Sequence, residues 1–205
     1  MQTHDKQSSL ETLREIHTIM DRSARFISLS GWSGVWAGAA ALAGAAVAYG
    51  WITEGAGYTA TNYQPYVWLA LGVLAVALVG GYFFTARKAK ADGRPMWNNA
   101  TRQLVLQMAI PLAAGGLFSL VFLAKNDVEY VAPACLVFYG LALINGSKYT
   151  LSDIKYLGVL QVFLGATNLL MPGWGLYFWA TGFGGLHILY GIFMWNKYDN
   201  RRTEE

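Results

Sequence analysis

Long apolar stretches alternate with short polar segments six times along this chain of 205 residues. The apolar windows cover residues 31–51, 66–86, 104–124, 130–148, 155–171 and 175–196. A helix that crosses a bilayer needs about 20 mostly apolar residues, and each window reaches or approaches this length. The pattern predicts an all-α membrane protein: a six-transmembrane helix bundle of three hairpins over residues 28–198, followed by a tail over residues 199–205.

The first 27 residues follow a different pattern, which is polar and typical of a helix on a surface. Ser8 followed by Glu11 fits a helix capping box. Leu10, Leu13, His17 and Met20 then recur with helical spacing on one face. We therefore expect an amphipathic helix within residues 1–27 that lies on the membrane surface or beneath the bundle.

The composition supports lipid as the main solvent of this chain. Hydrophobic residues make up 55% and charged residues 13%, whereas a soluble domain carries about 25% charged residues. The lipid bilayer is thus the first expected partner. The single cysteine, Cys135, excludes an intramolecular disulfide and argues against a cysteine-based metal cluster.

Fourteen of the fifteen Lys and Arg residues lie on one side of the predicted bundle. They are Lys6, Arg14, Arg22, Arg25, Arg87, Lys88, Lys90, Arg94, Arg102, Lys148, Lys155, Lys197, Arg201 and Arg202, and only Lys125 lies on the other side. The positive-inside rule then places both termini in the cytoplasm. Because these cations cluster at helix ends, they indicate topology and not a nucleic-acid partner.

Small residues form stripes on several predicted spans. Gly31, Gly34 and Gly38 share one face of the first span. Helices in lipid associate through close approach and interhelical hydrogen bonds, so such a stripe marks a packing face. Two interpretations stay open: packing inside one chain, or a seam with a second copy or with another membrane protein.

The last predicted hairpin combines small and polar residues. Gly158, Gln161, Gly165 and Asn168 share one face of the fifth span, and Gly184, His187 and Gly191 share one face of the sixth. A turn at Pro172-Gly173 places Gln161 within one helical turn of His187. We expect the two side chains to meet at mid-membrane depth, between glycines that let the two backbones approach, because an unpaired polar group there costs several kcal/mol.

The third span contains a proline that frees a backbone carbonyl. Pro111 has no N–H, so the carbonyl of Gln107 loses its helical partner and the helix tends to kink. Together with Gln161, Asn168 and His187, Gln107 forms a candidate intramembrane polar site. Such a site either holds helices together, or handles a substrate or proton. We predict no metal or cofactor, because the other two histidines, His4 and His17, lie in the polar N-terminal segment.

A polar turn follows the fourth span on the predicted cytoplasmic side. It contains Asn145, Ser147, Lys148 and Asp153. If the protein binds a cytoplasmic ligand, this turn is the first place to expect it. The chain carries no phosphate loop, no dinucleotide fingerprint, no HExxH motif and no nucleophile–histidine set, so we do not expect an enzyme.

Several segments resemble known bacterial membrane proteins. The stretches Lys155-Tyr156-Leu157-Gly158 and Phe163-Leu164-Gly165, the Pro172-Gly173 turn and the Gly-rich segment 182–191 resemble small six-helix bacterial inner-membrane proteins without assigned function. Segments 20–23 and 26–31 resemble the same group. The layout is also similar to that of HdeD-like acid-resistance membrane proteins, which carry Gly-rich hairpins with a Pro-Gly turn. This resemblance implies a bacterial inner (cytoplasmic) membrane location and carries no catalytic set.

Three functional hypotheses follow. The leading one is a non-enzymatic membrane protein that acts through protein or lipid contacts, in an envelope stress response or as an accessory subunit. The second is a small transporter or channel that uses the intramembrane polar site. The third is a sensor in which a ligand in the bundle moves the N-terminal helix.

Overall fold

The computed structural model describes residues 25–26, 28–55 and 63–200, and within these ranges the chain is helical, without strands. The helices are α2 (Gly31–Thr53), α3 (Gln64–Ala91), α4 (Asn99–Ala124), α5 (Val131–Gly146), preceded by the 3-10 turn η1 (Val128–Tyr130), and α6 (Ile154–Leu169). A last continuous helix consists of α7 (Gly175–Trp179), the π-helical η2 (Ala180–Leu186), α8 (His187–Met194) and the π-helical η3 (Trp195–Asp199). The expected amphipathic helix lies outside the described residues.

The lengths and composition of these helices are those of a multi-pass α-helical membrane protein. In the part of the chain that the structure describes, five helical segments are long and apolar enough to cross a membrane: Gly31–Thr53, Gln64–Ala91, Asn99–Ala124, Val128–Gly146 and Gly175–Asp199. The fifth predicted span corresponds to α6, which has 16 residues; α5 has the same length, but the turn η1 extends it to a 19-residue segment.

The helices α3 and α4 extend further into the charged connection than the hydrophobic pattern predicts. The apolar windows end at residue 86 and begin again at residue 104, whereas α3 ends at Ala91 and α4 begins at Asn99. Lys88 and Lys90 lie in the last turn of α3, where cations interact favourably with the helix dipole. Asn98 caps α4, and its side chain accepts a hydrogen bond from the backbone N–H of Thr101 at 2.8 Å.

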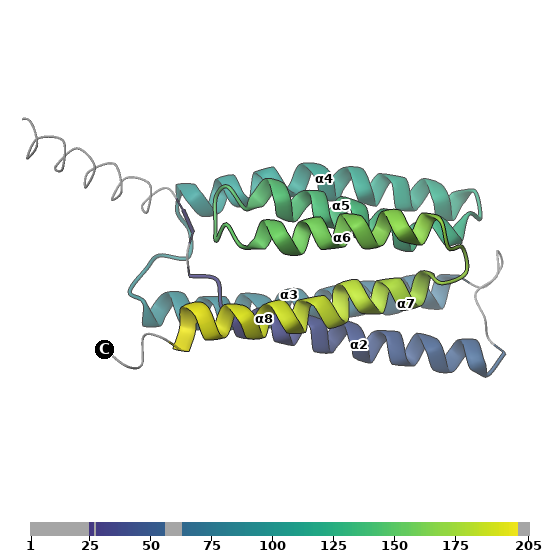
Figure 1. The fold of residues 1–205 in the computed structure, drawn as a ribbon, viewed down its shortest axis with the longest axis horizontal. Helices are drawn as coiled ribbons and strands as arrows, with labels where there is room; N and C mark the ends of the chain where they lie inside the picture. Colours follow the sequence, from purple (N-terminus) through teal and green to yellow (C-terminus); the bar gives the residue numbers. More distant parts are fainter. Residues whose placement is uncertain (1–24, 27, 56–62, 201–205) are drawn as a thin grey trace, which may run out of the picture.

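The six long helical segments form two groups of three, and this arrangement corrects the expected third hairpin. The α2 half contains α2, α3 and the last helix, while the α5 half contains α4, α5 and α6 (Figure 1). Two expected hairpins, α2–α3 and α4–α5, pack along their lengths. The third opens, because α6 packs mainly on α5 and the last helix packs mainly on α2. We call the interface between the two halves the seam.

The glycines explain this division. An added Cβ on Gly158 would lie 2.7 Å from the carbonyl oxygen of Gly140 on α5, and one on Gly165 would lie 2.9 Å from that of Pro133. On the last helix, a Cβ on Gly191 would lie 2.7 Å from the carbonyl oxygen of Gly31 on α2. The glycines of α6 and of the last helix thus face two different partners. The expectation that they let these two helices approach each other was wrong.

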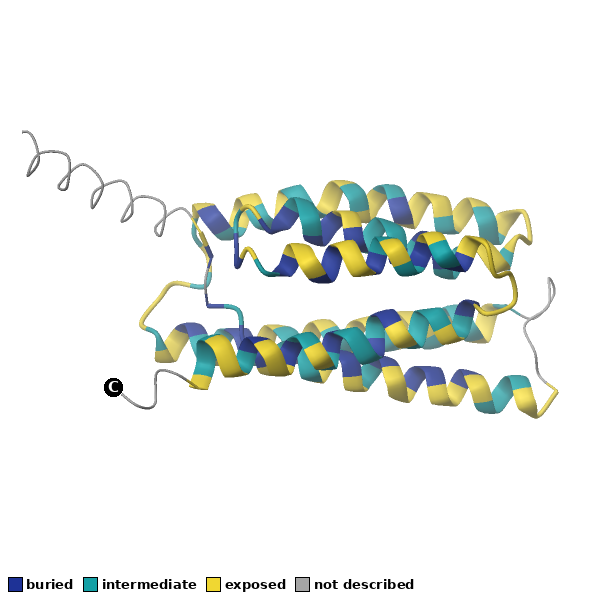
Figure 2. Ribbon diagram, viewed as in Figure 1, coloured by how far each residue is buried: buried dark blue, intermediate teal, exposed yellow. Residues whose placement is uncertain are grey.

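The stripe on α2 also packs inside the chain. A Cβ on Gly34 would lie 3.1 Å from the Cα of Gly191, and one on Gly38 would lie 2.7 Å from the carbonyl oxygen of Gly184. Of the two interpretations left open by the sequence, the structure shows the one within a single chain. The outward faces of α3 and α4 are apolar, and only 6% of the most apolar window of either helix is buried. The ribbon of α4 is accordingly mostly exposed or intermediate (Figure 2).

Candidate functional site

A layer of buried polar groups crosses the seam midway along the helices. The Gln161 side chain, which is 0% exposed, donates a hydrogen bond of 2.8 Å to the carbonyl oxygen of Gly182. His187 Nδ1 lies 3.0 Å from the same oxygen, and His187 Nε2 lies 2.8 Å from the hydroxyl of Tyr139 on α5. Gln161 and His187 therefore meet as expected, but through a shared backbone carbonyl and not directly.

The chemistry of these partners determines the tautomer of His187. A carbonyl oxygen only accepts hydrogen bonds, so Nδ1 carries the proton that it donates to Gly182. In a neutral ring Nε2 then has a free lone pair that accepts from the Tyr139 hydroxyl. Both ring nitrogens therefore have partners. The Gly182 carbonyl lies in the π-helical segment η2, a widened geometry that often occurs at functional sites.

The four residues of the predicted intramembrane site do not form one cluster. Gln107 is instead paired with Asn145, whose Nδ2 donates to the carbonyl oxygen of Gln107 at 2.8 Å and to its Oε1 at 3.1 Å. Asn168 is 2% exposed and lies at the other end of α6, where Nδ2 approaches the carbonyl oxygen of Met171 at 3.4 Å. The carbonyl freed by Pro111 thus has a partner, and α4 is one continuous helix through this proline.

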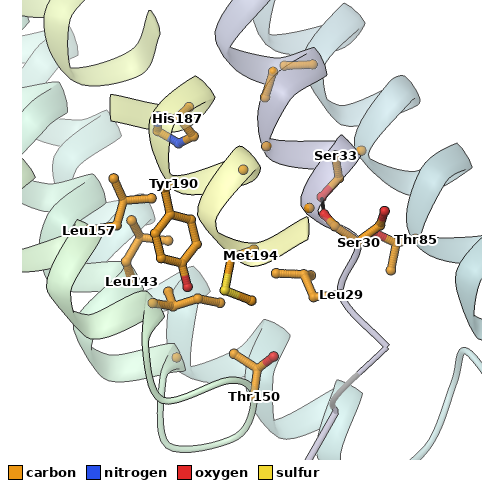
Figure 3. Close-up of a pocket in the computed structure, with 18 of the residues that line it drawn as sticks. Leu29, Ser30, Ser33, Thr85, Leu143, Thr150, Leu157, His187, Tyr190 and Met194 are labelled. Atoms are coloured by element: carbon orange, nitrogen blue, oxygen red, sulfur yellow. Dashed lines mark hydrogen bonds between the residues drawn. The ribbon is translucent and has the colours of Figure 1, made fainter. Parts of the chain in front are cut away.

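A cavity of about 290 Å³ lies in the seam next to this polar layer. It lies towards the basic end of the bundle, which we define as the end where α2, α4 and α6 begin. His187, Tyr190, Leu143 and Leu157 line one side of it, and Ser30, Ser33 and Thr85 line the other (Figure 3). None of the described residues that line this first cavity is Lys, Arg, Asp or Glu. Its walls are mostly apolar, and its few polar groups are uncharged.

One hydroxyl in this cavity lacks a hydrogen-bond partner. The Tyr190 hydroxyl points into the space between the halves (Figure 3), is buried, and makes no hydrogen bond with any described residue. A buried hydroxyl without a partner costs about 1–3 kcal/mol, so a ligand oxygen that accepts from it would be stabilised. The other hydroxyls are largely used internally, since Ser33 donates to the carbonyl oxygen of Ser30 at 2.6 Å and Thr150 to that of Phe26 at 2.6 Å.

The first cavity reaches the outer surface between α3 and α4. Leu78 of α3 lines the cavity, yet 64% of this residue is exposed. Leu104 and Met108 of α4 line the other edge. The helix α3 packs extensively only on α2, so nothing comparable to the α2–α3 contact closes the gap towards α4. In a bilayer this opening faces the lipid chains.

A short extended segment closes the basic end of the cavity. We call residues 26 and 28–30 the strap. The backbone N–H of Phe26 donates to the carbonyl oxygen of Tyr149 at 2.7 Å, which ties the strap to the α5 half. Lys88 donates to the carbonyl oxygen of Leu29 at 2.8 Å, which ties it to the α2 half. Leu29 itself lines the first cavity.

Asp199, at the end of the last helix, holds the start of α2 in place. We call its contacts with Lys88 and Gly31 the latch. The Asp199 carboxylate forms an ion pair with Lys88 and accepts a hydrogen bond of 3.1 Å from the backbone N–H of Gly31. The N-terminus of a helix carries partial positive charge, so this carboxylate stabilises α2 as a cap does. Asp199, which the sequence assigned to the tail, thus contributes to the bundle.

The polar turn after α5 is held by local and long-range contacts. Ser147 donates to the carbonyl oxygen of Ile144 at 2.7 Å, and Lys148 is exposed. Asp153 accepts from Lys197 at 2.6 Å and from Tyr198 at 2.9 Å. Partial desolvation raises the pKa of Asp153, but the hydrogen bonds from Lys197 and Tyr198 and the nearby positive charge outweigh it, so the pKa lies below its ordinary value.

Sequence reasoning missed Tyr139 and Tyr190. Both lie in apolar helices, and tyrosine is common in membrane proteins at interfacial depth, so by residue type alone they could not be distinguished from interfacial anchors. The signal that could have identified them is their position: both lie inside α5 and α8, away from the helix ends where anchoring residues occur.

Comparisons with known proteins add no relative. No protein-family model, curated protein or solved structure matches this chain. The resemblance to HdeD-like proteins stays a prediction. Among the described residues, no group of three His, Cys, Asp or Glu side chains is placed to hold a metal ion.

Proposed function

We propose that this protein is a non-enzymatic membrane protein that acts through lipid contacts, and that it binds an uncharged lipid-like molecule in the first cavity. The ligand has an apolar body and one oxygen that accepts a hydrogen bond. The observation that carries the proposal is the unpartnered Tyr190 hydroxyl in an apolar cavity of about 290 Å³. This size is close to the lower end of the range for small-molecule sites.

The lining determines the charge of the ligand. A charged head in this cavity would have no described ion-pair partner, and burying an unpaired charge costs far more than burying an apolar group. The opening at Leu78 faces lipid, so the ligand enters from the bilayer. An uncharged molecule that is already dissolved in the membrane meets both conditions.

Photolabelling tests this proposal. The probe is a monoacylglycerol with a diazirine on its acyl chain, presented in phosphatidylcholine vesicles that contain the protein. We expect the label on residues that line the first cavity, including Leu143 and Met194. Lysophosphatidic acid with the same photoreactive chain is the control for charge and should label these positions weakly. Label confined to outward-facing residues such as Leu74 and Leu120 would contradict the proposal.

Two variants sharpen the test. Leu143→Trp fills the cavity and should abolish the label, whereas Leu141→Trp, on the exposed face of the same helix, should leave it unchanged. Tyr190→Phe removes only the hydroxyl and should weaken binding by roughly two- to tenfold, the value of one hydrogen bond. Tyr156→Phe is its control, because Tyr156 is 61% exposed.

Sensing is a second candidate, favoured by the position of Leu29. This strap residue lines the cavity, so a bound ligand contacts the segment that leads to the N-terminal region. We expect the uncharged probe to change the rate of tryptic cleavage at Arg25, while the rate at Lys90, which is exposed in the last turn of α3, stays constant. Equal rates with and without probe would argue against this role.

We also propose six crossings, with the basic end in the cytoplasm of a bacterial inner membrane. The helix α6 would span about 24 Å at 1.5 Å per residue, shorter than the hydrocarbon core of about 30 Å, and local thinning of the bilayer would accommodate the difference. Nine of the ten Lys and Arg residues among those described lie at the basic end, which supports this orientation. A periplasm-active phosphatase fused after residue 205 should be inactive, and one inserted at Asn126 should be active.

A further inference from the structure

A second cavity lies in the same seam at the opposite end of the bundle. Its volume is about 190 Å³, and its walls include Val67 of α3, Cys135 of α5 and Trp179 of α7. The only charged residue among its described lining residues is Glu129, which is exposed. We call this the far cavity. Like the first cavity, it is mostly apolar and lies between the two halves.

The ring of Phe183 lies between aromatic residues that line the two cavities. The ring of Phe183 lies 5.3 Å from that of Trp179, which lines the far cavity. On its other side the same ring lies 5.1 Å from that of Tyr139 and 6.0 Å from that of His187, which both line the first cavity. Tyr139 and His187 are fixed by hydrogen bonds, whereas the side chain of Phe183 has no polar atom to hold it.

We propose that Phe183 sets the length of the chain that this protein binds. The two cavities are two parts of one elongated site, and the Phe183 ring ends the first part at the polar layer. A ligand whose chain stops at this ring fits the first cavity, and a longer chain has no room. This inference rests on the proposed function, because it requires an uncharged chain in the first cavity.

A competition experiment tests the inference. Unlabelled monoacylglycerols from octanoyl to hexadecanoyl compete with the photoreactive monoacylglycerol at equal mole fraction in phosphatidylcholine vesicles. We expect the wild type to prefer one of the shorter chains. Phe183→Ala should move the preference to longer chains, with the ratio of hexadecanoyl to decanoyl competition rising at least about threefold, because the added methylene groups fill the void that the substitution leaves. A probe with a terminal diazirine should then label the peptide that contains Cys135.

Matched variants separate this inference from the proposed function. Phe193→Ala removes an exposed ring from the same helix and should not change the preferred chain length. Phe183→Leu should give an intermediate preference and Phe183→Trp a shorter one, so the test holds even if the alanine variant does not fold. An unchanged preference in all three Phe183 variants, with the first cavity still labelled, would overturn the inference alone. Absence of specific labelling in the wild type would overturn both proposals.

Discussion

The side-chain amide of Asn145 donates a hydrogen bond of 2.8 Å to the carbonyl oxygen of Gln107, the carbonyl that Pro111 leaves without its helical partner. One amide on α5 thus compensates for a proline on α4. The contact also joins the two helices, since the same nitrogen donates to Oε1 of Gln107 at 3.1 Å. A residue pair from the predicted intramembrane site and the predicted polar turn therefore acts as a link within the α5 half.

A double-mutant cycle measures this compensation. Asn145→Leu should lower the free energy of unfolding by about 0.6–1.7 kcal/mol, the range for interhelical hydrogen bonds in membrane proteins. In a Pro111→Ala background, the backbone N–H of residue 111 restores a partner to Gln107, and the cost of Asn145→Leu should fall. Unfolding in mixed micelles with increasing sodium dodecyl sulfate gives both values. Equal costs in the two backgrounds would show that the proline and the amide are not coupled.

The packing of the last helix on α2 gives a second prediction. Gly191→Ala should destabilise the protein by about 1–3 kcal/mol, because its Cβ would lie 2.6 Å from the backbone nitrogen of Val35. Gly185→Ala is the control, since no atom lies within 4 Å of its added Cβ. Thermal unfolding in detergent compares the two. If this stripe served only contacts between copies, Gly191→Ala would change the oligomeric state and leave the stability of the monomer intact.

The latch gives a third prediction. Asp199→Ala leaves Lys88 and the N-terminus of α2 without their carboxylate, so it should cost about 2–4 kcal/mol and loosen the strap. Hydrogen exchange should become faster at Leu29 and Gly31 and stay unchanged at the far end of the bundle. Asp127→Ala, at an exposed position at that far end, is the matched control. Unchanged exchange in the strap would show that Lys88 and Thr150 hold it without the latch.

The lowered pKa of Asp153 gives a prediction for pH. Because the folded pKa is below the ordinary value of 3.8, the ionised carboxylate stabilises the fold above that pH. This contribution is lost as the pH falls through the folded pKa. Asp153→Asn should therefore lower the melting temperature slightly at pH 7, and the difference from the wild type should begin to shrink only once the pH has fallen below 3.8, as the carboxylate is protonated in the folded protein. A difference that does not shrink at any acidic pH would assign the effect to another group.

Part of the site could be predicted from residue spacing. The proximity of Gln161 and His187 was predicted from helical periodicity and the Pro172-Gly173 turn, and in the structure both side chains contact the carbonyl oxygen of Gly182 and not each other. The partner of Gln107 could not be predicted in the same way. Asn145 belongs to a different segment with the polarity expected of a helix end, and only the packing of α4 on α5 brings it to the freed carbonyl.

Hydrophobic length and helical spacing were enough to establish the helices, the membrane class and the glycine faces, because these properties depend on residues close together along the chain. The choice of partner for each glycine face was a property of the tertiary structure. Gly158 could meet α8 or α5 with equal chemistry, and it meets Gly140 of α5 because the last helix packs on α2. This choice opens the third hairpin, and the opened hairpin leaves the seam in which Tyr190 and the two cavities lie.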